Sequence, residues 1–238
     1  MVSTHIHSAY DEDLKFLTRR ISEMGGLAEQ MVGESVRALV NGDVSLAQKV
    51  ISDDTILDHA EREVGDKAIL TIARRQPMAV DLREIVSALR VANDLERIGD
   101  LAKNIGKRVI ALNGEFPPPK LIRGVEHMAE LVLSQLKDVL DAYGRRDVAK
   151  AVAVWKGDEE VDAMCTSLFR ELLTYMMEDP RNISFCIHLM FCAKNIERIG
   201  DHATNIAETV FYMIEGQQIL DKRPKGDMTA FATTVPGS

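Results

Sequence analysis

Residues 94–105 read Asp-Leu-Glu-Arg-Ile-Gly-Asp-Leu-Ala-Lys-Asn-Ile, and residues 195–206 read Asn-Ile-Glu-Arg-Ile-Gly-Asp-His-Ala-Thr-Asn-Ile. Eight of these twelve positions are identical, at an offset of 101 residues. From the first copy onward, apolar residues recur at alternating spacings of three and four, which is typical of a helix packed against other helices. The residues of this seam are Leu95, Ile98, Ala102, Ile105, Val109 and Leu112.

Two acidic residues of each copy lie off this seam. Glu96 and Asp100 are four residues apart, so they share one face of the predicted helix. Like charges at this spacing destabilise an isolated helix by about 0.2–0.5 kcal/mol. The second copy repeats the arrangement with Glu197 and Asp201, so this mildly unfavourable choice occurs twice and requires an explanation.

Composition restricts the class of protein. The 238 residues are rich in helix-forming types and show no alternating apolar and polar runs, which predicts an all-helical fold. The net charge of −8 argues against nucleic acid or an anionic membrane as a partner, although 29 Lys and Arg residues allow local basic patches. We find no signal peptide, transmembrane run or disulfide framework, and we expect a cytoplasmic protein with buried thiols.

Helical periodicity and turn signals predict six long helices. Their expected ranges are 14–41, 44–75, 79–112, 121–143, 147–179 and 182–215, with Gly42, Gly144 and Gly216 as helix ends. Residues 113–119 include three consecutive prolines and predict an extended connector. We therefore expect two tandem antiparallel three-helix bundles at residues 14–113 and 120–216, and a flexible tail at 217–238.

Additional acids on the second helix of each unit are predicted to face those of the third. Asp58 lies 19 residues before Pro77 and Glu96 lies 19 residues after it, so an antiparallel hairpin brings both to one level. Counting outward from Pro77, or from the Asp179–Pro180 junction, gives three more pairs: Asp54 with Asp100, Asp162 with Glu197, and Asp158 with Asp201.

Four carboxylates at one level require countercharge. One interpretation is a solvated ion-pair network with Arg97, Arg198 and nearby lysines. The other is a metal site, in which oxygen donors suit hard divalent or trivalent cations such as Mg, Mn, Ca or iron, and structural zinc is disfavoured. The metal's identity stays open, zinc included. Auxiliary roles are considered for Asp94, Asn104 and Asn205, whereas His59 and His202 are not favoured as ligands.

The doubled Glu-Arg-Ile-Gly-Asp-x-Ala-x-Asn-Ile motif, preceded by Arg-Gln-Pro-Met-Ala-x-Asp-Leu-Arg at residues 75–83, resembles the PhoU family of bacterial phosphate-signalling proteins. The resemblance covers about residues 14–216. It implies two bundles related by a pseudo-twofold repeat. It also implies multinuclear metal clusters held by Asp54, Asp58, Glu96, Asp100, Asp158, Asp162, Glu197 and Asp201.

The same resemblance implies a function. Members are cytoplasmic, often dimeric, negative regulators of the phosphate-starvation response, and are thought to link the phosphate transporter's ATPase to a sensor histidine kinase. This chain departs from the family pattern at Asn195, which stands where the first repeat has Asp94, and at residues 178–183, where the Arg-Gln-Pro signature is missing. We therefore expect the second site to bind metal less tightly.

Two other classes of protein are considered. A di-metal carboxylate enzyme would carry Glu-x-x-His pairs in its core, and the sequence contains none. A metal-free helical scaffold is the third interpretation. No nucleophile–base group or phosphate-binding loop is recognisable, so we expect a protein that is not an enzyme.

Overall fold

The computed structural model describes residues 2–112 and 119–219, and its elements in these ranges are all helical. The first bundle contains α1 (Val2–Asn41), α2 (Val44–Arg75) and α3 (Val80–Leu112). The second contains α4 (Pro119–Arg145), α5 (Val148–Lys156), α6 (Asp158–Glu178), the short 3₁₀ helix η1 (Pro180–Asn182) and α7 (Ile183–Glu215).

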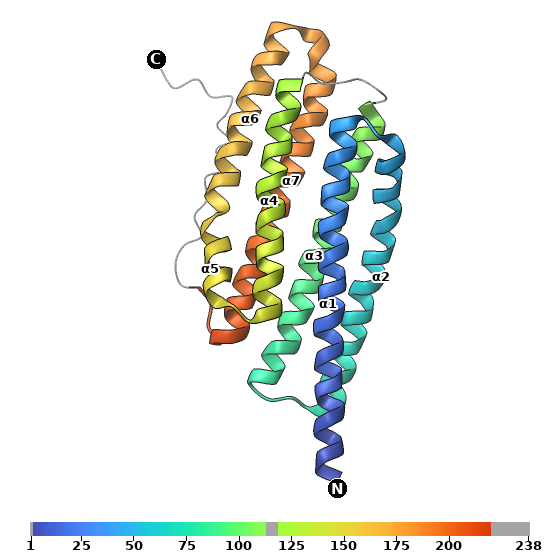
Figure 1. The fold of residues 1–238 in the computed structure, drawn as a ribbon, viewed down its shortest axis with the longest axis vertical. Coiled ribbons are helices and arrows are strands. Elements are labelled where there is room, and N and C mark those ends of the chain that lie inside the picture. The colour runs from blue at the N-terminus through green and yellow to red at the C-terminus, as the bar shows by residue number, and fades with distance from the viewer. Residues whose placement is uncertain (1, 113–118, 220–238) are drawn as a thin grey trace.

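The two bundles lie side by side, and the α2–α3 and α6–α7 turns stand at opposite ends of the molecule (Figure 1). This arrangement confirms the all-helical fold with two antiparallel three-helix bundles. The extended connector lies at residues outside those described, as does most of the tail. The exact domain limits stay a prediction.

The turns between the first two helices of each bundle use related chemistry. Gly42 has a φ of 63°, and Asp43 caps α2 by accepting a hydrogen bond from the Leu46 amide at 2.9 Å. Asp147 caps α5 in the same way. Helix α4 continues one residue past Gly144, because Arg146, at the position of Gly42, takes the left-handed conformation with a φ of 56°.

The predicted fifth helix is interrupted at Gly157. Its amide donates to the carbonyls of both Ala153 and Val154, which tightens the end of α5. Its carbonyl accepts a hydrogen bond from Gln135 of α4 at 2.9 Å. The single helix expected at 147–179 is therefore wrong, since α5 ends and α6 begins at Gly157, where a side chain of another helix contacts the backbone.

Helix α1 begins at Val2, twelve residues before the expected start near Leu14. Asp13, the last residue of this extension, contacts α2: its carboxylate lies 2.5 Å from Lys67 Nζ and 3.5 Å from Arg75 Nε. The sequence analysis missed the extension because the apolar periodicity that it used begins near Leu14.

Helix α3 packs on more than one side, against α1 and α2 of its own bundle and against α7 of the other. Its predicted seam, from Leu95 to Leu112, is buried. Helices α3 and α7 cross antiparallel, because Arg90 of α3 lies over the Tyr212 ring and Arg108 lies over the Phe191 ring.

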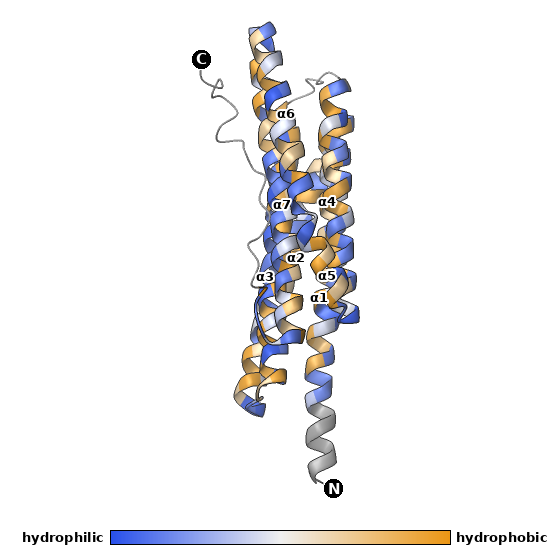
Figure 2. Cartoon of the chain, turned by 90° about the vertical axis from the view of Figure 1, so that its left-hand side faces the viewer, coloured by the Kyte–Doolittle hydropathy of each residue, from blue (hydrophilic) through white to orange (hydrophobic). Residues whose placement is uncertain are grey.

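Apolar residues are spread over both bundles. Figure 2 shows apolar and polar residues interleaved along the helices. Among the described helices, none combines the length and apolar character that crossing a membrane requires. As expected, three cysteines are buried thiols that form no disulfide among the described residues: Cys165, Cys186 and Cys192.

The two mid-helix glycines are predicted to respond differently to alanine. A Cβ at Gly99 would overlap the buried side chain of Leu57, whereas one at Gly200 would lie 3.5 Å from Gln135 and Val132, an ordinary contact. Alanine gains about 1 kcal/mol of helix propensity, and overpacking costs about 1–3 kcal/mol. We expect Gly200→Ala to stabilise the protein by up to about 1 kcal/mol and Gly99→Ala to be less stable than Gly200→Ala by about 1–3 kcal/mol in urea unfolding. Equal stabilities would contradict this packing.

Candidate metal centre

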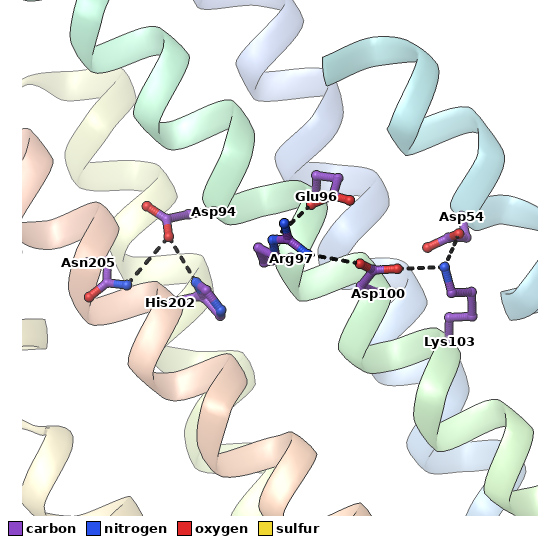
Figure 3. Close-up of polar contacts among 8 residues, drawn as sticks. All are labelled: Asp54, Asp94, Glu96, Arg97, Asp100, Lys103, His202 and Asn205. Atoms are coloured by element: carbon purple, nitrogen blue, oxygen red, sulfur yellow. Dashed lines mark hydrogen bonds and ion pairs between the residues drawn. The ribbon is translucent and has the colours of Figure 1, made fainter. Parts of the chain in front are cut away.

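The first carboxylate group joins α2 and α3 through a lysine. Lys103 Nζ lies 2.5 Å from Asp54 Oδ2 and 2.5 Å from Asp100 Oδ1 (Figure 3). Burial lowers the pKa of an ammonium group, but the hydrogen bonds to Asp100 and Asp54 raise the pKa of Lys103 above its ordinary value. The ammonium is therefore fully charged, and Asp54 and Asp100 share one cation.

Glu96 belongs to the same group. Burial raises the pKa of its carboxyl, and the neighbouring charges of Asp100 and Asp58 raise it further. Arg97 partly offsets this effect, and its guanidinium lies 3.5 Å from both Glu96 and Asp100. These effects place Asp58 and Asp100 within electrostatic reach of Glu96, and Lys103 joins Asp54 to Asp100.

The second carboxylate group, between α6 and α7, is more deeply buried. Asp158, Asp162 and Glu197 expose only 2%, 3% and 5% of their surface. Burial raises the pKa of Glu197, a hydrogen bond from Lys194 at 2.9 Å opposes this shift, and the charges of Asp162 and Asp201 add to it. The second hairpin therefore also brings its acids together.

The two groups differ at one repeat-related position. Thr204 occupies the place of Lys103, and its hydroxyl donates to Asp158 at 3.1 Å. The first group thus contains an ammonium between its carboxylates, and the second has a neutral hydroxyl there. Both groups nevertheless contain a lysine, since Lys194 contacts Glu197 in the second, so the expected order of metal affinities stays a prediction.

The donor chemistry of both groups fits a hard cation. Among the described residues, no three His, Cys, Asp or Glu side chains form a ready-made coordination shell, so binding requires rotation of these side chains. Two observations support a cation. Glu197 Oε2 is buried and has no hydrogen-bond partner in the described part of the chain. Lys103 shows that Asp54 and Asp100 already hold positive charge between two helices.

The auxiliary candidates lie elsewhere, at the α3–α7 crossing. Asp94 Oδ1 lies 2.8 Å from His202 Nδ1 and 3.5 Å from Asn205 Nδ2, on the side of α3 away from Glu96 (Figure 3). Asn104 and Asn195 line a pocket at the other end of the crossing. Asp94 and Asn205 therefore contact the opposite bundle, whereas Asn104 and Asn195 line a pocket between the two helices.

Three residues that the sequence analysis did not single out take part in the carboxylate groups: Lys103, Lys194 and Thr204. Each lysine lies three residues from an acid of the motif, at the spacing that allows a contact on one helix face. Arg198, named as a countercharge, is exposed and makes no ion pair among the described residues.

A family model described as the PhoU domain matches residues 21–109 and 125–210, once in each bundle. The chain belongs to the PhoU family. A relative from Rhizobium meliloti (strain 1021), named phosphate-specific transport system accessory protein PhoU homolog, is 69% identical over 235 residues, 99% of each chain. A relative of the same name from Caulobacter vibrioides (strain NA1000 / CB15N) is 49% identical and covers 95% of this chain and 99% of its own.

Solved PhoU structures share the fold. The crystal structure of PhoU from Pseudomonas aeruginosa superposes with a TM-score of 0.85 at 39% identity, covering 87% of this chain and all of that one. The phosphate transport system regulatory protein PhoU from Streptococcus pneumoniae gives a TM-score of 0.81 at 25% identity, covering 88% of this chain and 99% of that one. The resemblance of this chain to the PhoU family, which the doubled motif indicated, is thus confirmed.

The raised pKa of Glu197 predicts a pH-dependent effect of Glu197→Gln. The pKa of Glu197 is higher in the folded protein than in the unfolded chain, so the fold favours the protonated carboxyl. This contribution to stability is fully present below the unfolded pKa and is lost as pH rises through the folded pKa. In chelator-treated protein at about pH 7.5, we expect Glu197→Gln to raise the midpoint of thermal unfolding by about 2–4 °C. The difference should vanish near about pH 4, where the wild-type carboxyl is protonated.

The matched control is Glu130→Gln on α4, whose side chain is 71% exposed. This variant should melt within about 1 °C of wild type at both pH values. A Glu197→Gln protein that melts below wild type at the higher pH would contradict the assignment of a destabilising buried charge.

Proposed function

We propose that this chain is a cytoplasmic negative regulator of the phosphate-starvation response, which couples a phosphate ABC transporter to a sensor histidine kinase and modulates phosphate uptake. In this proposal its direct partners are the transporter's ATPase subunit and the kinase, and the chain acts as a homodimer without catalysis. Hard metal ions, held at the two carboxylate groups, serve structure or sensing.

The observation that carries the regulatory proposal is the PhoU domain in both bundles, together with relatives named accessory proteins of a phosphate-specific transport system. The relatives match along nearly the whole chain. A phosphate-transport regulator is the function that these names support, and the transporter and kinase are the specific partners proposed here.

Exposed apolar residues at both ends of the molecule support docking onto other proteins. Met78, in the α2–α3 turn, is 81% exposed, and Met177, at the end of α6, is 86% exposed. Further exposed apolar residues adjoin each turn: Val80 and Leu82 at one, Ile183 and Ile187 at the other. Figure 2 shows apolar ribbon at the end of the molecule below the α3 label. Such residues are enriched at protein interfaces rather than on free surfaces.

The metal part of the proposal follows from the chemistry of the acids. A bound hard cation supplies positive charge that lowers the repulsion among the carboxylates of each group. Asp54, Asp58, Glu96 and Asp100 would hold it in the first bundle, and Asp158, Asp162, Glu197 and Asp201 in the second. Asp94, Asn104 and Asn205 lie at the bundle crossing and are not part of this ligand set.

Metal analysis tests the carboxylate groups. In protein purified without chelator, we expect Asp100→Asn and Asp201→Asn each to lower the bound metal by about half, because each removes a donor from one of two groups. Asp66→Asn on α2, an exposed acid outside both groups, is the control and should keep the wild-type metal content. Equal trace amounts in all four proteins would exclude the metal clusters and leave the regulatory proposal intact.

Gene expression tests the regulation. Cells that lack this chain should express a phosphate-starvation reporter in high phosphate at least about tenfold above wild-type cells, because the kinase is no longer restrained. The readout is reporter activity in replete and depleted medium, with the intact gene returned as a control. Normal repression in the absence of the chain would overturn the proposed regulation.

A further inference from the structure

A basic pocket lies at one end of the α3–α7 crossing, outside the carboxylate groups. Its volume is about 370 Å³, within the range of small-molecule sites. Two of the residues that line it are charged, and both are cations at adjacent positions of α3. The lining residues are Asn104, Lys107, Arg108, Ala111, Phe191 and Asn195.

The two cations of this pocket are not neutralised by the protein. Within the part of the chain that the structure describes, neither Lys107 nor Arg108 forms an ion pair with a carboxylate. Arg108 instead lies over the Phe191 ring, 4.1 Å from its centroid. The whole chain has a net charge of −8, but this pocket holds two adjacent cations without an ion-pair partner. The pocket is therefore locally positive and favours binding of an anion.

Neighbouring groups give this pocket a fixed shape. Asn195 Nδ2 donates to the carbonyl of Phe191 at 2.8 Å, which anchors the amide side chain beside the ring. The Arg108 guanidinium stacks on the same ring, so part of the cost of orienting it is met before binding. The pocket thus presents one oriented planar donor, one flexible ammonium and the amides of Asn104 and Asn195.

The pseudo-twofold repeat provides a comparison within the same molecule. At the other end of the crossing, a pocket of about 250 Å³ includes Arg90, Asn205, Glu208 and Tyr212. At the repeat offset of 101, Glu208 stands in the place of Lys107, and Arg90 stands in the place of Phe191. Arg90 lies over the Tyr212 ring at 5.2 Å, so the cation–aromatic contact is kept. The carboxylate of Glu208 removes the positive character there.

We propose that the pocket around Lys107 and Arg108 binds the phosphate group of a small molecule, either inorganic phosphate or a small phosphate ester. The guanidinium and the ammonium bind phosphate oxygens through charge-assisted hydrogen bonds, and the Asn104 amide adds a neutral donor. The volume exceeds that of free phosphate and leaves room for an organic group against Phe191, whose surface is 48% exposed. This site needs no metal and is separate from the carboxylate groups.

Equilibrium dialysis of the full chain tests the site, with radiolabelled inorganic phosphate in one arm and AMP in the other. Chelator treatment removes metal that could bind phosphate at the carboxylates. We expect saturable binding by the wild type and about tenfold weaker binding by Lys107→Gln, because one charge-assisted contact is lost. Lys107 is exposed, so this variant should fold, which circular dichroism verifies.

The matched control is Arg90→Gln, which makes the same change of charge in the pseudo-symmetric pocket. Its affinity should stay within about twofold of wild type, and the double variant Lys107→Gln/Arg108→Gln should show no saturable binding. Tighter binding of AMP identifies a phosphate ester as the ligand class, and equal or tighter binding of inorganic phosphate identifies the free anion. Absence of saturable binding in both arms up to about 10 mM, or equal weakening by Arg90→Gln, would overturn the proposal.

Discussion

Burial of α3 and α7 on several sides decides where polar chemistry can occur in this molecule. Each of these helices packs against its own bundle and against the other, so apolar residues occupy most of its circumference. Polar side chains remain only on narrow strips between the contacts. Because successive residues turn by about 100°, Asp94 and Glu96 fall on opposite sides of α3. Glu96 belongs to the carboxylates beside α2 and Asp94 to the contact between bundles, while other polar residues of α3, such as Lys107, are exposed.

The sequence was sufficient for the architecture, since the doubled motif and the turn residues are local signals. Gly42, Asp43 and Gly216 end or begin helices as expected. The interruption at Gly157 was missed, and the Gln135 side chain that contacts its backbone comes from a different helix, which no local signal reveals. The early start of α1 was missed because the expected start was taken from apolar periodicity, which begins near Leu14.

The sequence predicted the height of the candidate acids along their helices, but not the directions in which their side chains point. Counting outward from the turns placed the acids of neighbouring helices together, because antiparallel helices keep a common rise per residue. Rotation about each helix axis depends on side-chain packing, which a count does not contain. Nearby lysines were considered as countercharge, but the structure alone identified Lys103 as the one between Asp54 and Asp100 and placed Asp94 against His202. Lys103 and Thr204 then show that similar motifs carry different local charge.

The antiparallel α3–α7 crossing has the form of an isologous dimer interface contained within one polypeptide. In a symmetric dimer of two identical repeats, every residue of such an interface would appear on both sides. Covalent linkage of the two repeats in one chain removes that constraint. One half carries Lys107 where the other carries Glu208, and Asp94 meets His202 while the repeat counterpart of Asp94 is Asn195. The two ends of the crossing therefore share one backbone arrangement but differ in charge.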